Sequence, residues 1–157
     1  KKMIDYGSRV LLSALEFNKK EMLLDVGCGY GTLGLTLAKA QELEVTLVDI
    51  NQRALDLARK NADANQVSAD IFQSNVYEQV TGQFHHIISN PPIRAGKQVV
   101  HEVISGSYDH LLADGDLTIV IQKKQGAPSA KTKMEEVFGN CETLKKDKGY
   151  YILRSVK

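Results

Sequence analysis

Short apolar runs alternate along the chain with longer segments in which apolar residues recur every three or four positions. The runs are typical of strands buried on both faces, and the helical period is typical of helices that bury one face. The pattern predicts strands over 21–27, 44–49, 68–74, 84–90 and 115–122, and two more within 141–156. It predicts helices near 10–15 and over 32–40, 51–65, 97–112 and 128–139. In the helix over 51–65, the residues expected to face the core are Ala54, Leu57, Ala58 and Ala62.

The order of these elements predicts the architecture. Strands that alternate with helices form a parallel sheet covered on both faces, because parallel neighbours need a long crossover connection. The last two strands are joined by a tight turn around 147–149, so they must pair antiparallel at one edge. The expected fold is α/β, a doubly wound, mostly parallel sheet with a C-terminal antiparallel hairpin. Ligands of such sheets bind at the carboxyl ends of the strands, near the point where the strand order reverses.

Composition narrows the class of protein. With 157 residues, 43% of them hydrophobic, the chain suits one globular domain over 1–157. A formal net charge of +1 means that any nucleic-acid surface must be a local patch. No apolar run approaches the roughly 18 residues of a membrane helix. The spacing of Cys28 and Cys141 is typical of neither a disulfide nor a metal site. We therefore expect a cytoplasmic protein without membrane contact.

The segment LDVGCGYGTLG places four glycines between the first predicted strand and its helix. Counted from Gly29, it matches the dinucleotide fingerprint G-x-G-x-x-G with Asp49 at the expected distance, so an NAD-dependent oxidoreductase is one interpretation. However, the apolar strand ends at Val26, so the loop begins at Gly27, and Asp25 puts a carboxylate at the strand end. A carboxylate there repels a pyrophosphate and attracts a cationic ligand. Asp49 ends the next strand, where its carboxylate can accept two hydrogen bonds from a ribose diol.

The segment IISNPPIRAGK ends the fourth predicted strand with an asparagine and two prolines. Proline fixes its own φ and holds the preceding residue extended, so we expect Asn90 and Pro91 to be extended. Neither Pro91 nor Pro92 has an N–H, which leaves the Asn90 side-chain oxygen and the Pro91 carbonyl as a rigid pair of acceptors. This pair, the amine clamp, suits a planar –NH2 group and would orient its nitrogen toward an electrophile. Catalysis would then come mainly from positioning and preorganised electrostatics.

On the motifs LDVGCGYGTLG, LVDIN, SNVYE and SNPPIRAGK, the chain resembles the class I S-adenosylmethionine-dependent methyltransferases of the small-domain (MTS) type. Within that group it is most similar to the enzymes that methylate guanine N2 in small-subunit (16S) ribosomal RNA. The resemblance implies S-adenosylmethionine as cofactor and ribosomal RNA or the small ribosomal subunit as partner. It also implies a segment upstream of DYGS that this chain lacks.

The resemblance assigns roles to individual residues. It implies that Asp49 faces the cofactor's ribose and Asn75 its adenine. The full set of implied cofactor contacts is Asp25, Gly27, Gly29, Gly31, Asp49, Asn75 and Asn90. The implied catalytic residues, which grip the target amine, are Asn90, Pro91 and Pro92. The residues expected to contact the substrate are Ile93, Arg94 and Lys97, with a phosphate-binding rim at Lys123, Lys124, Lys131 and Lys133.

Some positions depart from the family pattern and leave alternatives open. Asn75 stands where aspartate is usual, and Ile93 stands where many relatives have a tyrosine or phenylalanine that stacks on the base. The amine clamp suits a glutamine amide as well as a base, so a release-factor glutamine N5 methyltransferase is an alternative, as is the NAD-dependent oxidoreductase. We expect no metal, because the four histidines show no ligand spacing: His85, His86, His101 and His110.

Overall fold

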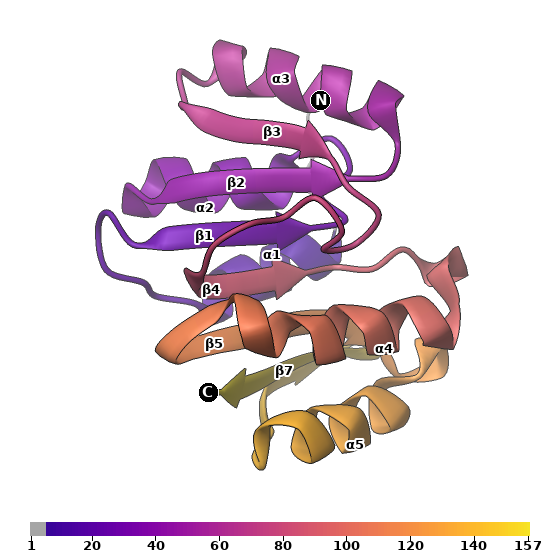
Figure 1. The fold of residues 1–157 in the computed structure, drawn as a ribbon. Helices are drawn as coiled ribbons and strands as arrows, with labels where there is room; N and C mark the ends of the chain where they lie inside the picture. The colour runs from indigo at the N-terminus through magenta and orange to yellow at the C-terminus, as the bar shows by residue number, and fades with distance from the viewer. Residues whose placement is uncertain (1–5) are drawn as a thin grey trace.

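The computed structural model describes residues 6–157, which are arranged around one seven-stranded sheet (Figure 1). The strands are β1 Met22–Val26, β2 Glu44–Asp49, β3 Ala69–Gln73, β4 Phe84–Ser89, β5 Leu111–Gln122, β6 Glu142–Asp147 and β7 Tyr150–Val156. The helices are α1 Tyr6–Ala14, α2 Thr32–Gln41, α3 Gln52–Ala64, α4 Gly96–Ser107 and α5 Ala127–Phe138. Short 3₁₀ helices are η1 Ile93–Ala95, η2 Tyr108–His110 and η3 Lys123–Gln125. Every predicted strand and helix is present; the strand over 44–49 has the predicted bounds, and most other bounds differ by a few residues.

The sheet has the strand order β3-β2-β1-β4-β5-β7-β6. Strands β1 to β5 pair in parallel, and β7 runs antiparallel to both β5 and β6. The fold class predicted from the sequence, a doubly wound, mostly parallel sheet with a C-terminal antiparallel hairpin, is therefore confirmed. The chain order reverses between β1 and β4, where the carboxyl ends of the parallel strands point to the right in Figure 1. A ligand site is expected at this edge.

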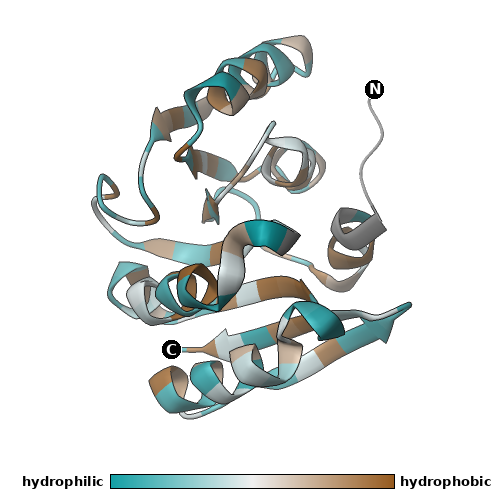
Figure 2. Cartoon of the chain, turned by 90° about the vertical axis from the view of Figure 1, so that its right-hand side faces the viewer, coloured by the Kyte–Doolittle hydropathy of each residue, from teal (hydrophilic) through white to brown (hydrophobic). Residues whose placement is uncertain are grey.

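Helices cover both faces of the sheet, as the view onto its carboxyl edge shows (Figure 2). The apolar residues of α4 and α5 form one core cluster, and those of α1, α2 and α3 form another. Successive residues of β1 go to opposite clusters: Leu24 packs with α4 and α5, and Leu23 with the other three helices. Both faces of the strand are thus buried, which explains its uninterrupted apolar run. None of the helices within residues 6–157 is long and apolar enough to cross a membrane.

The inward face of α3 differs from the prediction at one position. Leu57 is 39% exposed, whereas Leu55 is fully buried. Ala54, Ala58 and Ala62 are buried as expected. At 3.6 residues per turn, Leu55 lies about 60° from the centre of the alanine stripe and Leu57 about 100° from it. The helical period itself therefore favours Leu55 as the buried leucine, and the prediction for Leu57 was wrong.

The predicted helix over 97–112 ends earlier, at Ser107. Leu111 already belongs to β5, where it pairs with Phe84 and is fully buried. The register then shifts, so that His86 pairs with Asp116. The extra residues of β5 form a bulge, which hides the start of the strand from a pattern based on alternation.

The two adjacent histidines of β4 have structural roles. The Nδ1 atom of His85 accepts the backbone N–H of Met22 at 2.9 Å, which fixes the start of β1. The His86 ring lies between two carboxylates, with Nδ1 2.6 Å from Asp116 and Nε2 2.7 Å from Glu21. Burial opposes a charge on His86, but the hydrogen bonds to Asp116 and Glu21 outweigh it and raise the pKa of the ring. His86 thus forms ion pairs that connect β4 to Asp116 of β5 and to Glu21, the residue before β1.

Candidate functional site

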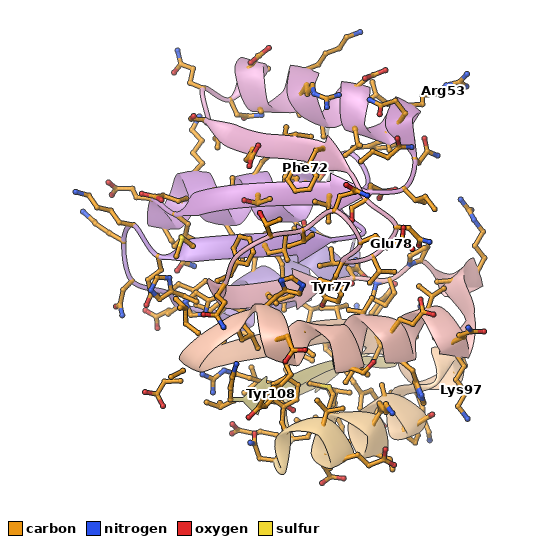
Figure 3. All side chains as sticks on the ribbon, viewed as in Figure 1. Arg53, Phe72, Tyr77, Glu78, Lys97 and Tyr108 are labelled. Carbon is orange, nitrogen blue, oxygen red and sulfur yellow. The ribbon has the colours of Figure 1, made fainter. Side chains whose placement is uncertain are left out.

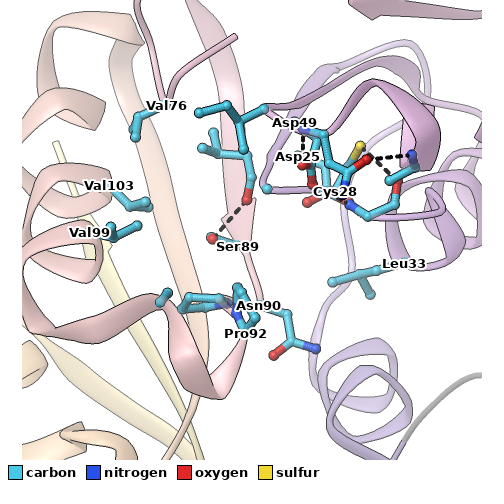
Figure 4. A pocket seen from close by; sticks show the side chains of 18 of the residues that line it. Asp25, Cys28, Leu33, Asp49, Val76, Ser89, Asn90, Pro92, Val99 and Val103 are labelled. Atoms are coloured by element: carbon cyan, nitrogen blue, oxygen red, sulfur yellow. Dashed lines mark hydrogen bonds between the residues drawn. The ribbon is translucent and has the colours of Figure 1, made fainter. Parts of the chain in front are cut away.

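A pocket of about 870 Å³ opens at the carboxyl ends of β1, β2 and β4 (Figure 4). Its volume lies in the range of small-molecule and cofactor sites. One wall is the loop between β1 and α2, and the opposite wall is the Asn-Pro-Pro segment that follows β4. The site therefore lies where the strand order reverses, as the sequence predicted.

The glycine loop contains two kinds of glycine. Gly27 and Gly29 have φ of +73° and +58°, and a Cβ on either would meet no atom within 4 Å. Both line the pocket, so their bare backbone is open to a ligand. Gly31, with φ +84°, is buried, and its Cβ would lie 3.0 Å from Leu47. The structure does not bring Gly31 to the pocket wall. A glycine is needed there because the turn requires a positive φ and the packed side chains leave no room for a Cβ.

Asp25 lies at the base of the pocket and is only 2% exposed. Burial, with a smaller contribution from the charge of Asp49, raises the pKa of Asp25 to about 7, although the hydrogen bond from the Gly34 N–H opposes this shift. That hydrogen bond measures 3.2 Å. A cation in the pocket would favour the ionised form of Asp25. The buried carboxyl is thus suited to a positively charged ligand.

Asp49 joins the end of β2 to the glycine loop. Its Oδ2 accepts the Gly29 N–H at 2.8 Å and its Oδ1 accepts the Asn51 N–H at 2.9 Å. Each carboxylate oxygen can accept more than one hydrogen bond, so both remain available to a diol. Capping of α3 falls instead to Asn51, whose side chain accepts the Ala54 N–H at 3.1 Å. Asn51, not Asp49, therefore caps α3.

Several apolar residues of this pocket were not predicted from the sequence, among them Ile50 and Val76. Ile50 is 62% exposed although it lines the cavity, and Val76 lines it as well. Val76 has φ +54°, which is rare for a β-branched residue and is typical of functional sites. The carbonyl of Val76 accepts the Ser74 hydroxyl at 2.8 Å, which helps to hold this conformation. The available signal was Ile50 itself, an apolar residue directly after the strand end at Asp49.

Asn75 directly precedes Val76 in the segment after β3. It is exposed and lines the cavity. Its Nδ2 is 3.4 Å from Glu78 Oε2, a long contact that leaves the amide oxygen facing elsewhere. Asn75 can therefore accept a hydrogen bond from a ligand amino group, as the resemblance implied.

The Asn-Pro-Pro segment forms the opposite wall, where the Asn90 side chain extends into the pocket (Figure 4). The end of β4 is fixed by Ser89, whose hydroxyl donates to the Val26 carbonyl at 2.8 Å. Pro91 is buried, and Pro92 is exposed with an extended ψ of 150°. No hydrogen bond within residues 6–157 occupies the side-chain amide of Asn90. The side chain of Asn90, one member of the amine clamp, is therefore available to a ligand.

The other member of the clamp has a partner that the sequence did not indicate. The side-chain nitrogen of Gln125, in the loop after β5, donates to the Pro91 carbonyl at 2.9 Å and to the Pro92 carbonyl at 3.1 Å. A carbonyl oxygen has two lone pairs, so Pro91 can accept a second donor. The clamp is thus more elaborate than the two acceptors expected.

The three expected substrate contacts lie beyond the prolines. Ile93 belongs to η1, but its side chain lies outside the described residues. Arg94 is exposed and lines the pocket, whereas Lys97 is exposed at the start of α4 and does not line it. Figure 3 shows Lys97 extending outward from that end of α4. Neither side chain forms an ion pair with another described residue, so both charges are available to a partner.

Cys28 also lines the pocket. Burial, together with the nearby charges of Asp25 and Asp49, raises the pKa of its thiol far above the ordinary value. The thiol is therefore protonated and suited to packing rather than to nucleophilic attack. Among the described residues, no group of three or more His, Cys, Asp or Glu side chains could hold a metal ion.

Comparison with known proteins identifies the family. The methyltransferase small domain family matches residues 1–154. The uncharacterized protein YbxB of Bacillus subtilis is 46% identical over 162 residues, which cover all of this chain and 81% of that protein. The ribosomal RNA small subunit methyltransferase C of Erwinia tasmaniensis is 37% identical over 159 residues, but they cover 98% of this chain and only 46% of that protein. This chain thus spans about half the length of that relative.

A solved structure provides a view of a bound relative. The T. thermophilus 16S rRNA N2 G1207 methyltransferase (RsmC), in complex with AdoMet and guanosine, matches with a TM-score of 0.89 and 29% identity. The match covers 99% of this chain and 44% of that one. The class I methyltransferase fold expected from the resemblance is therefore confirmed.

The residues of the pocket fit S-adenosylmethionine. Asp25 offers a buried carboxyl for a cationic ligand, Asp49 offers a carboxylate for a ribose diol, and exposed Ile50 offers an apolar surface for a flat ring. With the family and the structural neighbour, this fit decides between the two interpretations of the glycine loop: the cofactor is S-adenosylmethionine, not NAD. By sequence, fold and pocket, the chain belongs to the methyltransferase small domain family.

Proposed function

We propose that this chain transfers a methyl group from S-adenosylmethionine to an exocyclic amino group, namely guanine N2 of small-subunit (16S) ribosomal RNA. The observation that carries the proposal is the side-chain amide of Asn90, which enters the pocket beside the Pro91 carbonyl without a partner among the described residues. Two adjacent acceptors match the two N–H donors of an –NH2 group. The guanosine bound to the T. thermophilus relative and the names of the ribosomal RNA relatives support guanine.

In this proposal, the cofactor lies along the glycine loop. Asp25, Gly27 and Gly29 hold its methionine part, Asp49 holds the ribose, and Asn75 accepts from the adenine amino group. S-adenosylmethionine, when bound, supplies a methyl group on a positively charged sulfur. Because a cation favours the ionised form of Asp25, whose pKa is raised to about 7, binding and ionisation support each other near neutral pH.

The amine clamp supplies the catalysis. The amide oxygen of Asn90 and the carbonyl of Pro91 accept the two amine hydrogens, which directs the nitrogen lone pair toward the cofactor. The amine of guanine is a poor nucleophile because its lone pair is delocalised into the ring. Holding it in the reactive orientation avoids the entropic cost of finding that orientation. The extra proton of the methylated nitrogen leaves to solvent, so no strong base is needed.

Substrate binding would rest on the basic residues around the clamp. Arg94 and Lys97 follow the prolines, and Lys123 and Lys124 lie in η3, which Gln125 joins to the prolines. All four side chains are exposed. Cations at these positions suit the phosphates that flank a target nucleotide. We take ribosomal RNA or the small ribosomal subunit as the partner, residues 1–157 as one methyltransferase domain, and the cytoplasm as its location.

One observation favours a second candidate, methylation of a glutamine side chain in a release factor. The carboxamide of Gln125 is bonded to the Pro91 carbonyl, so a glutamine amide fits this acceptor. The exposed cations Arg94 and Lys97 favour RNA over a short peptide loop, because RNA brings a phosphate at every nucleotide.

A panel of acceptors tests the choice. The protein and S-adenosylmethionine labelled on its methyl group are incubated with undermethylated small subunits, large subunits, naked 16S RNA and release factors. The proposal expects label in the small subunit or its RNA, recovered as N2-methylguanosine by mass analysis. Label in glutamine would favour the second candidate, and label only in adenine would contradict both.

A further inference from the structure

The loop after β5 contains a side chain whose bonding the proposed function does not use. Gln125 is the last residue of η3, lies half-buried and lines the pocket. Its side-chain nitrogen donates to the carbonyls of Pro91 and Pro92 at 2.9 and 3.1 Å, and its side-chain oxygen accepts the Gln122 N–H at 3.2 Å. We call these three hydrogen bonds the Gln125 bridge. It joins the segment after β4 to the loop after β5, 34 residues further along the chain.

The bridge restrains a segment that has few other restraints. Pro91 and Pro92 have no N–H, so their backbone can be held only through its carbonyl oxygens. The Pro92 carbonyl also accepts the Ala95 N–H at 2.9 Å, within the η1 turn. Among the described residues, Gln125 is the donor to the Pro91 carbonyl. The direction of the carbonyl that belongs to the amine clamp therefore depends on one side chain.

The other end of the bridge is fixed to the antiparallel part of the sheet. Gln122 ends β5 opposite Tyr150 and donates its side-chain nitrogen to the Tyr150 hydroxyl at 3.0 Å. The backbone N–H of Lys123 donates to the Gly149 carbonyl at 2.9 Å. Because β7 anchors the loop in this way, Gln125 is held on a rigid support. The bridge therefore connects the β6–β7 hairpin to the transfer site.

We propose that Gln125 is a positioning residue for methyl transfer: it holds the Pro91 carbonyl in the direction in which that carbonyl accepts a hydrogen from the target amine. This rests on the proposed function, since it requires an amine bound between Asn90 and Pro91. Both N–H groups of Gln125 are used in the bridge, so Gln125 acts through Pro91 and does not recognise the substrate itself. The second lone pair of the Pro91 carbonyl serves the amine.

Two variants and one matched control test the bridge. Gln125→Ala removes it, and Gln125→Glu replaces the donor nitrogen with an oxygen that repels the two carbonyls. Gln83→Ala is the control, because the side-chain nitrogen of Gln83 also donates to two backbone carbonyls, those of Asp109 and Leu111, and Gln83 does not line the pocket. For each protein we would measure kcat, the Kd for S-adenosylmethionine by calorimetry, and hydrogen exchange of the backbone amides in 93–99.

The expected result separates positioning from general damage. Gln125→Ala should lower kcat about 10- to 100-fold, because a small misplacement of a reacting group costs this much. Its Kd for S-adenosylmethionine should stay within about twofold of wild type, since the cofactor residues lie on the opposite wall, and exchange over 93–99 should be faster. Gln125→Glu should be at least as impaired, and Gln83→Ala should resemble wild type in all three measurements.

Other outcomes would overturn the proposal. An unchanged kcat in Gln125→Ala would show that the Pro91 carbonyl needs no such support. A higher kcat would show that Gln125 instead occupies the place of the amine. If the wild-type protein methylates none of the acceptors, the proposed function fails. Hydrogen exchange then decides on the bridge by itself, because unchanged exchange over 93–99 in Gln125→Ala would exclude it.

Discussion

Replacing Asp49 with asparagine changes one atom at a site where both carboxylate oxygens already accept backbone N–H groups, from Gly29 at 2.8 Å and from Asn51 at 2.9 Å. The amide has only one oxygen, so its NH2 group must face one of these donors. A hydrogen bond to a charged group contributes about 1.5–3 kcal/mol. Losing one such bond to the ribose diol would weaken binding of S-adenosylmethionine about 10- to 150-fold, at about 1.4 kcal/mol per factor of ten.

Titration calorimetry measures this effect directly. The matched control is Asp56→Asn, which removes an exposed carboxylate on α3 that pairs with Arg59 at 3.1 Å, outside the pocket. The control should bind S-adenosylmethionine as the wild type does. If Asp49→Asn also bound within twofold of wild type, with its fold intact by circular dichroism, Asp49 would not be the ribose ligand.

Three further predictions concern other parts of the structure. Arg94→Gln should reduce the slope of log K for RNA binding against log salt by about one, measured by filter binding, and an unchanged slope would remove Arg94 from the phosphate contacts. His86→Gln should lower the free energy of unfolding in urea more at pH 6 than at pH 9. Burial opposes the charge of His86, but its two carboxylate partners raise its pKa. The stabilisation is therefore complete below the unfolded pKa of about 6.5 and is lost as the pH rises through the folded pKa. Gly31→Ala should destabilise the protein by about 1–3 kcal/mol more than Gly27→Ala in thermal unfolding, because only the Cβ at position 31 meets packed side chains, and equal effects would contradict this.

Much of the site could be predicted because it depends on local sequence. Asp25 and Asp49 end buried strands, and the carboxyl ends of neighbouring parallel strands meet at one edge of the sheet. Proline fixes its own φ whatever surrounds it, and the φ of −64° at Pro92 agrees with this. These features required no knowledge of distant contacts.

The features that the sequence did not predict depend on contacts between distant segments. Gln125 reaches Pro91 only because β5 lies beside β4, and a glutamine in a lysine-rich loop looks like any solvated residue. The packing role of Gly31 also became clear only from its contact with Leu47, which lies on β2.

The most direct test of the amine clamp is the single-turnover rate of Asn90→Ala with the acceptor that the wild type methylates. The Asn90 amide has no partner among residues 6–157, so its removal leaves no described group unsatisfied, and the fold should be preserved. Loss of one preorganised acceptor should slow transfer about 10²- to 10³-fold, while the Kd for S-adenosylmethionine remains largely unchanged. Transfer at nearly the wild-type rate in this variant would contradict the claim that Asn90 and Pro91 orient the target amine.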